Sequence, residues 1–337
     1  MEIYILSLVL GLVVGSFLNV VVYRTEKNKS LGGRSFCPRC KRLIKWYDNV
    51  PLLSFLLLRG KCRQCGKKIS VQYPLVESIT GLVFFGAAYL VTNNLINDWL
   101  NHYFILTGLM TVVAKLGVTP SLFGLDQNLK FLELVFLFFV LSVFVAILIY
   151  DLKFMLIPDS FTLWGVAFVL VFNILADVFL WVGALAAKNQ LFILEVAGLS
   201  KKALPVGPLP INISEFFGYL PDNFYASIIH FQQHWPALIL GSRTGSGLVA
   251  GLAAAGIFFL IVYLSRETWM GMGDVKLIFL LGFFLGIFKT AVALFLAFEI
   301  GAVLGIILIV LGRAKMKTAL PFGPFLIVGA ILSLLFI

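Results

Sequence analysis

The segment FLELVFLFFVLSVFVAILIY (131–150) decides the class of this protein, and Asp151 follows it directly. About 20 consecutive, predominantly apolar residues are the length of an α-helix that crosses the hydrocarbon core of a bilayer. An ionisable side chain beside such a segment costs on the order of several kcal/mol and is usually retained because it has a function. Residues 131–150 are therefore predicted to span a membrane, and Asp151 is predicted to be a functional residue.

The whole chain has the composition of a membrane protein. Of its 337 residues, 61% are hydrophobic and 12% are charged, and the mean hydropathy is +1.02. A single soluble core cannot bury this much apolar surface, so we expect an all-α polytopic membrane protein with about eight transmembrane helices. The predicted spans are 3–23, 75–92, 131–150, 160–187, 245–264, 275–288, 290–312 and 319–337.

Half of the basic residues lie in one loop. Of 26 Lys and Arg residues, 13 fall between Arg24 and Lys68. Lys and Arg are enriched in cytoplasmic loops, so this loop is predicted to face the cytoplasm. The span 3–23 precedes these charges, so we expect it to be retained, not cleaved as a signal peptide, with its N-terminus outside. Counting spans from this loop places a further set of charged residues at the cytoplasmic face: Asp151, Lys153, Arg266, Asp274, Lys276, Arg313, Lys315 and Lys317.

These observations divide the chain into four parts. We expect an N-terminal transmembrane helix at 1–23, a cytoplasmic loop at 24–73, a transmembrane helix with an outer or interfacial segment at 74–130, and a membrane domain at 131–337. Residues 103–118 are apolar but short, and we interpret them as outer or interfacial. Residues 188–243 are rich in proline and aromatic residues and are predicted to be an outer connection.

The basic loop contains two C-x-x-C pairs, Cys37 with Cys40 and Cys62 with Cys65, which are all the cysteines of the chain. Pairs about 20 residues apart supply four thiolates for a tetrahedral ion, so we predict a structural zinc site and a zinc-binding loop domain. Two disulfides are the alternative, but a cytoplasmic loop lies in a reducing compartment. Zinc ribbons also bind nucleic acid. Because this loop is tethered between two spans, we expect membrane lipid headgroups as its partner, and no nucleic acid.

Three aspartates near predicted helix ends differ in their expected roles. Asp159 follows Pro158 and precedes an apolar run, so it is predicted to cap the next helix. Asp274 follows Gly271 and Gly273, which permit positive φ and a close approach of a substrate strand. Asp151 and Asp274 share the cytoplasmic side and are predicted to form one site; the alternative is salt bridges from these aspartates to Lys153 and Lys276.

Two carboxylates that lie a few Å apart share a proton, so the ionised one can activate water while the protonated one polarises a peptide carbonyl. This chemistry is that of an aspartic protease. His230 and His234 have the spacing of a helical zinc pair, but the segment between them lacks the glutamate of a metalloprotease. We therefore do not expect a metal site there.

In chain order, the motifs resemble those of the bifunctional type IV prepilin peptidases, from one end of the chain to the other. The matching segments are GSFLNVVVYR (15–24), the two C-x-x-C pairs, WYDNVP (46–51), ISVQYPLVE (69–77), Asp151 with IPD (157–159), GMGD (271–274) and PFGP (321–324).

The resemblance implies an aspartic protease of the bacterial inner membrane, related in catalytic plan to presenilin. Members cut the leader from prepilins and pseudopilins after a glycine and then methylate the new N-terminal amine with S-adenosylmethionine. Asp151 and Asp274 would be the catalytic dyad. The zinc loop would be tied to methyl transfer, with Gly60 and Lys61 important for it, and Pro321 to Pro324 would line the active site.

The chain also departs from this family. It is longer than usual, with the extra length at 94–130 and 188–243, and no glycine-rich loop places S-adenosylmethionine. A member with peptidase activity alone is therefore an alternative. A proton-coupled transporter would carry its acids near the midplane and show matching halves with broken helices. A membrane-anchored zinc module that recruits another protein would leave the aspartates without a role.

Overall fold

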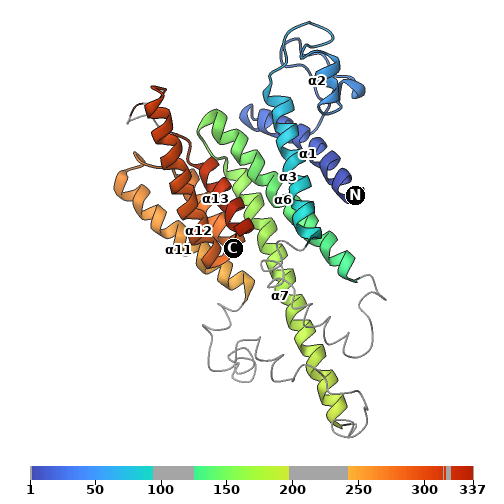
Figure 1. The fold of residues 1–337 in the computed structure, drawn as a ribbon, viewed down its shortest axis with the longest axis vertical. Helices are drawn as coiled ribbons and strands as arrows, with labels where there is room; N and C mark the ends of the chain where they lie inside the picture. The colour runs from blue at the N-terminus through green and yellow to red at the C-terminus, as the bar shows by residue number, and fades with distance from the viewer. Residues whose placement is uncertain (1, 94–124, 197–241, 314, 316–319, 337) are drawn as a thin grey trace.

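The structure is a computed structural model that describes residues 2–93, 125–196, 242–313, 315 and 320–336 (Figure 1). It consists of helices, and no β-strand occurs in these ranges. Short elements in the basic loop are the 3-10 helix η1 (Trp46–Asn49) and α2 (Leu53–Leu57). The long helices are α1 (Glu2–Glu26), α3 (Gln72–Thr92), α6 (Leu125–Phe154), α7 (Asp159–Val196), α11 (Arg243–Ser265), α12 (Met272–Val310) and α13 (Gly323–Phe336).

Within these described ranges, six helices are long and apolar enough to cross a membrane, and the apolar stretch Gly323–Leu334 of α13 is shorter. The backbone of α12 is broken at Gly286, where φ is 77° and ψ is 178°. This break lies within the first of the two predicted spans, 275–288, close to its junction with 290–312. Counting α12 as two spans and adding α13 gives the predicted number of about eight. The all-α membrane fold is thus confirmed.

Two helix boundaries differ from the predicted ones. α6 begins at Leu125, inside the expected outer segment, and α7 extends to Val196, inside the expected outer connection 188–243. The added residues, LDQNLK (125–130) and KNQLFILEV (188–196), include charged and amide side chains, and each helix is longer than a bilayer requires. The segments 94–124 and 197–241, with the predicted interfacial stretch 103–118, lie outside the described residues.

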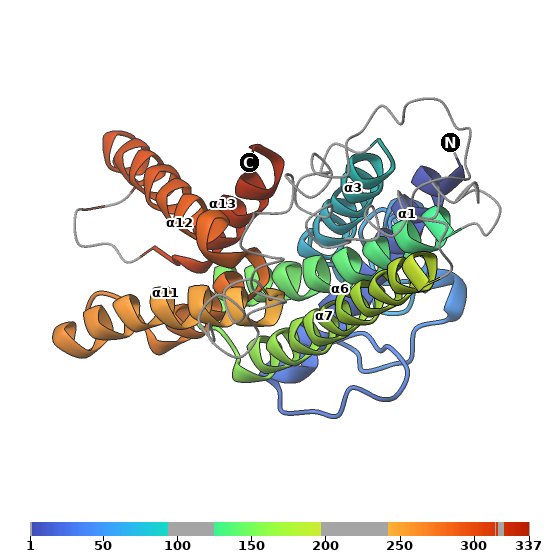
Figure 2. The same cartoon turned by 90° about the horizontal axis from the view of Figure 1, so that it is seen from below.

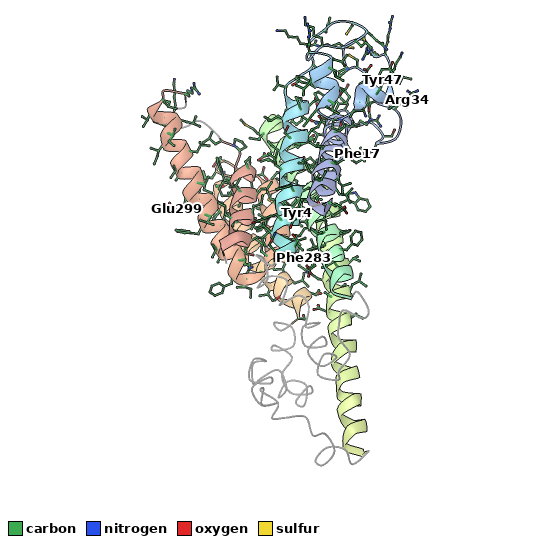
Figure 3. All side chains as sticks on the ribbon, turned by 45° about the vertical axis from the view of Figure 1, so that its right-hand side comes forward. Tyr4, Phe17, Arg34, Tyr47, Phe283 and Glu299 are labelled. Carbon is green, nitrogen blue, oxygen red and sulfur yellow. The ribbon has the colours of Figure 1, made fainter. Side chains whose placement is uncertain are left out.

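The pair α1 and α3 packs through small residues. A Cβ atom at Gly11 would lie 2.6 Å from the carbonyl oxygen of Thr80, and one at Gly15 would lie 2.8 Å from Cα of Glu77. Gly11 and Gly15 form the G-x-x-x-G spacing that lets transmembrane helices approach closely. At the other end of the pair, the Thr92 hydroxyl lies 2.9 Å from the Tyr4 hydroxyl. Figure 3 labels Tyr4 at that end, far from Tyr47 in the basic loop.

The C-terminal helices also pack closely through small residues. A Cβ at Gly247 of α11 would lie 2.5 Å from the Phe283 carbonyl oxygen of α12, and one at Gly329 of α13 would lie 2.3 Å from that of Ala293. α6 contacts α1 and α3 on one side and α13 on the other (Figure 2). Stacked rings reinforce its packing, with centroids 4.2 Å apart for Phe84 and Phe138. α6 therefore carries Asp151 to the junction of the two helix groups.

Candidate active site

Asp151 lies in the last turn of α6, and its side chain is buried, with 4% of the residue exposed. Its Oδ2 atom accepts a hydrogen bond of 3.1 Å from the backbone N–H of Gly323, the first residue of α13. Its carbonyl oxygen accepts one of 2.8 Å from Met155, whose φ of 53° is unusual for a residue with a side chain. The end of α6 is thus bent sharply at the candidate site.

Asp274 lies in the first turn of α12 and is half-buried. The turn between α6 and α7 touches both neighbouring segments through Ile157. A Cβ at Gly273 would lie 3.1 Å from Cβ of Ile157, and one at Gly323 would lie 3.5 Å from its Cδ1. The carboxyl groups of Asp151 and Asp274 are close enough to interact electrostatically. The structure therefore brings the two predicted aspartates to one place.

The alternative that Lys153 and Lys276 neutralise the aspartates is wrong. The Nζ atom of Lys153 lies 3.9 Å from a carboxylate oxygen of Glu26, and Nζ of Lys276 lies 2.5 Å from Oδ1 of Asp159. Asp159 begins α7 as expected, but the hydrogen bond of its carboxylate joins it to Lys276 on α12, not to free N–H groups of its own helix. The lysines thus tie neighbouring helices together and leave the dyad without a cation from either.

The glycines before Asp274 have a different role from the expected one. Neither Gly271 nor Gly273 has a positive φ. Gly271 is extended at the start of α12, with φ of −88°, and Gly273 permits the close contact with Ile157. The positive φ that glycine permits is thus not used at either position, and the close approach that Gly273 allows is one between segments of this chain.

The segment 321–324 contributes through its backbone. Gly323 and Pro324 are buried, and the Gly323 N–H is the donor to Asp151. A Cβ at Gly323 would lie 2.6 Å from Oδ2 of Asp151. From the sequence, this glycine was grouped with Pro321 and Pro324, and no contact with Asp151 was predicted for it. The signal in the sequence that could have found it is a glycine between Phe322 and Pro324 at the start of a helix.

The four cysteines of the basic loop also come together. One Sγ atom from each of Cys37, Cys40, Cys62 and Cys65 can be grouped within 4.8 Å of the others, and all four thiols are free. This arrangement is compatible with a tetrahedral zinc site. Disulfide pairing, the alternative, is not found among these cysteines.

Two similar turns present the cysteines. In the first, the Cys37 N–H donates to the Arg42 carbonyl at 3.0 Å, and in the second the Cys62 N–H donates to the Lys67 carbonyl at 2.9 Å. The residue after each second cysteine, Lys41 or Gly66, has a positive φ, of 58° and 67°. Backbone N–H groups of Cys65 and Gln64 at the Cys62 sulfur lower the pKa of that thiol to about 7.

The positions of Gly60 and Lys61 separate their roles. Gly60 has φ of 66°, donates its N–H to the Phe55 carbonyl at 2.9 Å and accepts from Ile69 at 2.7 Å. Gly60 closes the turn that follows α2 and precedes the second cysteine turn, which explains the glycine without a ligand. Lys61 is exposed beside Cys62. No contact of its side chain with the dyad is described.

The loop is fastened to the membrane helices by residues that the sequence analysis missed. Arg24 is buried, and its guanidinium donates to backbone carbonyls of 30–34. Glu77 of α3 is buried and accepts from the Leu52 N–H at 2.8 Å. Within the loop itself, Asp48 forms a two-point ion pair with Arg63, with oxygen–nitrogen distances of 2.7 and 2.9 Å. For Glu77, the available signal in the sequence was a charged residue inside an apolar helix. His230 and His234 lie outside the described residues.

Two sequence families match the chain. The bacterial Peptidase A24 N-terminal domain matches residues 9–91, and the type IV leader peptidase family matches residues 224–306. The first match contains the cysteine loop and Glu77, and the second contains Asp274. These two segments are similar to the type IV leader peptidase family.

Curated relatives match the chain over different lengths. A protein named prepilin leader peptidase/N-methyltransferase from Myxococcus xanthus is 60% identical over 78 residues, which are 23% of this chain and 23% of that protein. One of the same name from Vibrio cholerae is 41% identical over 133 residues, 35% of this chain and 51% of that protein. Another from Legionella pneumophila is 24% identical over 357 residues, 98% of this chain and 90% of that protein. The chain thus aligns with about a quarter of the first relative, about half of the second and most of the third. No solved structure matches it significantly.

Proposed function

We propose that this chain is an inner-membrane aspartic endopeptidase that removes the leader from type IV prepilins and pseudopilins after a glycine, and then methylates the new N-terminal amine. Relatives that align over nearly its whole length carry the name prepilin leader peptidase/N-methyltransferase. The observation that carries the peptidase half is the meeting of Asp151, Asp274 and the Gly323 N–H at the ends of three helices.

The two carboxyl groups share one proton. The ionised group takes a proton from water as the water attacks the scissile carbonyl, and the protonated group donates to the carbonyl oxygen. Gly323 fixes the Asp151 carboxyl by donating to one of its oxygens, which leaves the other oxygen for water or substrate. The titration of the dyad belongs to the pair, not to either residue.

The position of the dyad sets where the substrate is cut. Asp151 ends one apolar helix and Asp274 begins another, so both lie at a membrane boundary. On the charge distribution, that boundary is the cytoplasmic one. The substrate would keep its apolar segment in the bilayer and present its leader on the cytoplasmic side.

The cysteine loop would hold zinc through Cys37, Cys40, Cys62 and Cys65. A site with four sulfur ligands leaves no open position, so the ion would order the loop 24–73 and take no part in the reaction. S-adenosylmethionine would supply the methyl group. Gly60 and Lys61 remain the residues that the family resemblance connects with methyl transfer, and Gly60 would act by shaping the loop. Basic residues of the same loop would contact lipid headgroups, and nucleic acid is not an expected partner.

A processing assay tests the proposal. Purified protein is mixed with a prepilin and S-adenosylmethionine, and the product is analysed by mass spectrometry. Wild type should yield a shortened product that carries one added methyl group. Asp151→Asn and Asp274→Asn should each abolish shortening, because an amide cannot take up the proton of water, while Asp159→Asn, which breaks an exposed ion pair with Lys276, should have little effect.

The same assay separates the alternatives. A shortened product without the methyl group would identify a peptidase-only member, and an intact prepilin with wild-type protein would favour the transporter or the recruiting module. Cleavage retained in either dyad variant would refute the assignment of Asp151 and Asp274.

A further inference from the structure

Glu77 is a buried carboxylate in the first half of an apolar membrane helix. The residue is 7% exposed. Two neutral donors reach its side chain, the Leu52 N–H at 2.8 Å and the Ser16 hydroxyl. Within the described part of the chain, no Lys, Arg or His forms an ion pair with it. A buried charge without an opposite charge is costly, so this site is one that a bound cation would stabilise.

The donor Leu52 is held in a strained backbone conformation. Its φ and ψ are 59° and −51°, and the Leu53 N–H bonds the Pro51 carbonyl at 2.6 Å across it. These angles and this bond define a γ-turn of the rare, positive-φ kind. Such conformations persist where the surroundings enforce them, and they occur preferentially at functional sites. The hydrogen bond from the Leu52 N–H to Glu77 joins this turn of the cysteine loop to α3.

A second buried acceptor lies on α1, beside the turn of α3 that precedes Glu77. Asn19 is 3% exposed, and its Nδ2 donates to the carbonyls of Gly15 and Tyr73 at 3.2 and 3.3 Å. Its Oδ1 atom accepts no hydrogen bond from the described residues. Tyr73 precedes Glu77 by one turn of α3, and Gly15 packs directly on the Glu77 backbone. The α1–α3 contact thus offers a carboxylate and an unused amide oxygen.

Two acceptors, one of them negatively charged, suit a cation that carries N–H groups. An ammonium has three such hydrogens, whereas the sulfonium of the methyl donor has none. The N-terminal amine that leader cleavage would create is protonated below its ordinary pKa of about 8. It must lose a proton before its nitrogen can attack a methyl group, so the reaction needs a base at the amine.

Glu77 is connected with the peptidase dyad through one apolar cluster. Val76, which precedes Glu77, packs with Ile149 of α6, and Tyr150, which precedes Asp151, packs against the same cluster. Glu77 therefore lies on the same end of the helices as the dyad and directly below the cysteine loop. An amine released at Asp151 and Asp274 would therefore form at the same end of the helices as Glu77.

We propose that Glu77 binds the new N-terminal ammonium of the cleaved substrate and removes one of its protons for methyl transfer, with Asn19 Oδ1 as a second acceptor. This rests on the proposed methyltransferase function. The proton moves from nitrogen to the Glu77 carboxylate. The freed nitrogen lone pair forms the bond to the methyl carbon, the carbon–sulfur bond of the donor breaks, and its electron pair stays on sulfur. The products are an N-methylated ammonium and S-adenosylhomocysteine.

The test uses full-length protein with a pilin that already lacks its leader, so that methylation is measured without cleavage. Glu77→Gln retains an oxygen for the Leu52 N–H but cannot take a proton. At pH 7 it should methylate about 100-fold more slowly than wild type, the usual effect of losing a general base. Its rate should rise about tenfold per pH unit up to about pH 8, where the amine loses its proton unaided. Wild type should show a weaker rise.

Two measurements separate this role from a structural one. Prepilin cleavage and bound zinc should be unchanged in Glu77→Gln, and Glu77→Asp, which keeps the charge, should recover part of the methylation rate. Glu26→Gln, a matched variant of an α1 glutamate that pairs with Lys27 and Lys153, should behave as wild type. Methylation at the wild-type rate in Glu77→Gln would overturn this inference alone. Loss of zinc and cleavage together, or equal loss in Glu77→Gln and Glu77→Asp, would make Glu77 a scaffold residue and also overturn it. Absence of methylation by wild type would overturn the methyltransferase proposal itself.

Discussion

The backbone N–H of Gly323 donates a hydrogen bond of 3.1 Å to Oδ2 of Asp151, 172 residues earlier in the chain. Both groups are buried, so the bond is shielded from water and sets the direction of the carboxyl group. The segment before α13 therefore belongs to the candidate active site, although no side chain of that segment provides the contact. A glycine is required there because a Cβ would lie 2.6 Å from Oδ2.

Gly323→Ala should reduce prepilin cleavage by about 100-fold, because the added methyl group displaces the Asp151 carboxyl by a few tenths of an Å or more. The control is Gly256→Ala in α11, where a Cβ meets no atom within 4 Å. Both variants are compared by initial cleavage rates at equal folded protein. Normal cleavage in Gly323→Ala would show that the hydrogen bond does not position the carboxyl.

Removal of zinc should impair methylation before cleavage. Cys62→Ser removes one of four grouped sulfurs, so the purified protein should lose its single zinc ion and residues 37–65 should become sensitive to protease. The dyad lies on other helices and should still cut prepilin. Lys67→Ala, an exposed neighbour in the same turn, is the control. Wild-type protein that folds normally without metal would contradict the zinc site.

Zinc binding should weaken as the pH falls. The pKa of the Cys62 thiol is lowered to about 7 by N–H groups of Cys65 and Gln64, so above pH 7 this thiol is already ionised and binds metal without losing a proton. Below pH 7 the proton must be displaced, and the affinity should fall by about tenfold per pH unit for each proton released. Competition with a chromophoric chelator between pH 6 and 8 measures this. An affinity that is constant across this range would contradict thiolate ligation.

The sequence predicted the features that depend on local composition. The apolar runs placed the spans, the C-x-x-C spacing placed the four cysteines together, and the isolated charges Asp151 and Asp274 marked the dyad. Even the break in α12 was anticipated, because two spans were predicted within a helix that Gly286 interrupts. Each of these inferences uses residues close together in the chain.

The sequence could not supply contacts between distant segments. Lys153 and Lys276 lie two residues from the aspartates, yet pair with Glu26 and Asp159, because helix packing brings those carboxylates nearer. Asp159 was predicted to cap its own helix because its partner, Lys276, lies on another helix and far away in the chain. Gly323 and Glu77 act through hydrogen bonds to backbone and side-chain atoms that no spacing in the chain reveals.

The G-x-x-x-G spacing in α1 predicts a stability effect. Gly11→Val would place its Cβ 2.6 Å from the Thr80 carbonyl oxygen, so α1 and α3 must separate. We expect a loss of about 1–3 kcal/mol, typical of overpacking, and a lower melting temperature in detergent. Gly86→Val in α3, where a Cβ meets no atom within 4 Å, should have a much smaller effect. Equal melting temperatures for the two variants would contradict close packing at Gly11.

The sidedness of the site can be tested with reporter cysteines in the zinc-loaded protein. Lys153→Cys and Lys276→Cys lie at the helix ends that carry the dyad, and the charge distribution places these ends in the cytoplasm. Asn93→Cys lies at the opposite end of α3 and serves as the outer control.

Intact cells are treated with a membrane-impermeant thiol reagent, and mass spectrometry identifies the labelled peptide, while bound zinc protects the four loop cysteines. Asn93→Cys should be labelled in intact cells, and the other two only after the membrane is opened. Labelling of Lys153→Cys and Lys276→Cys from outside would reverse the topology, because the dyad would then face away from the compartment in which a cytoplasmic leader is presented.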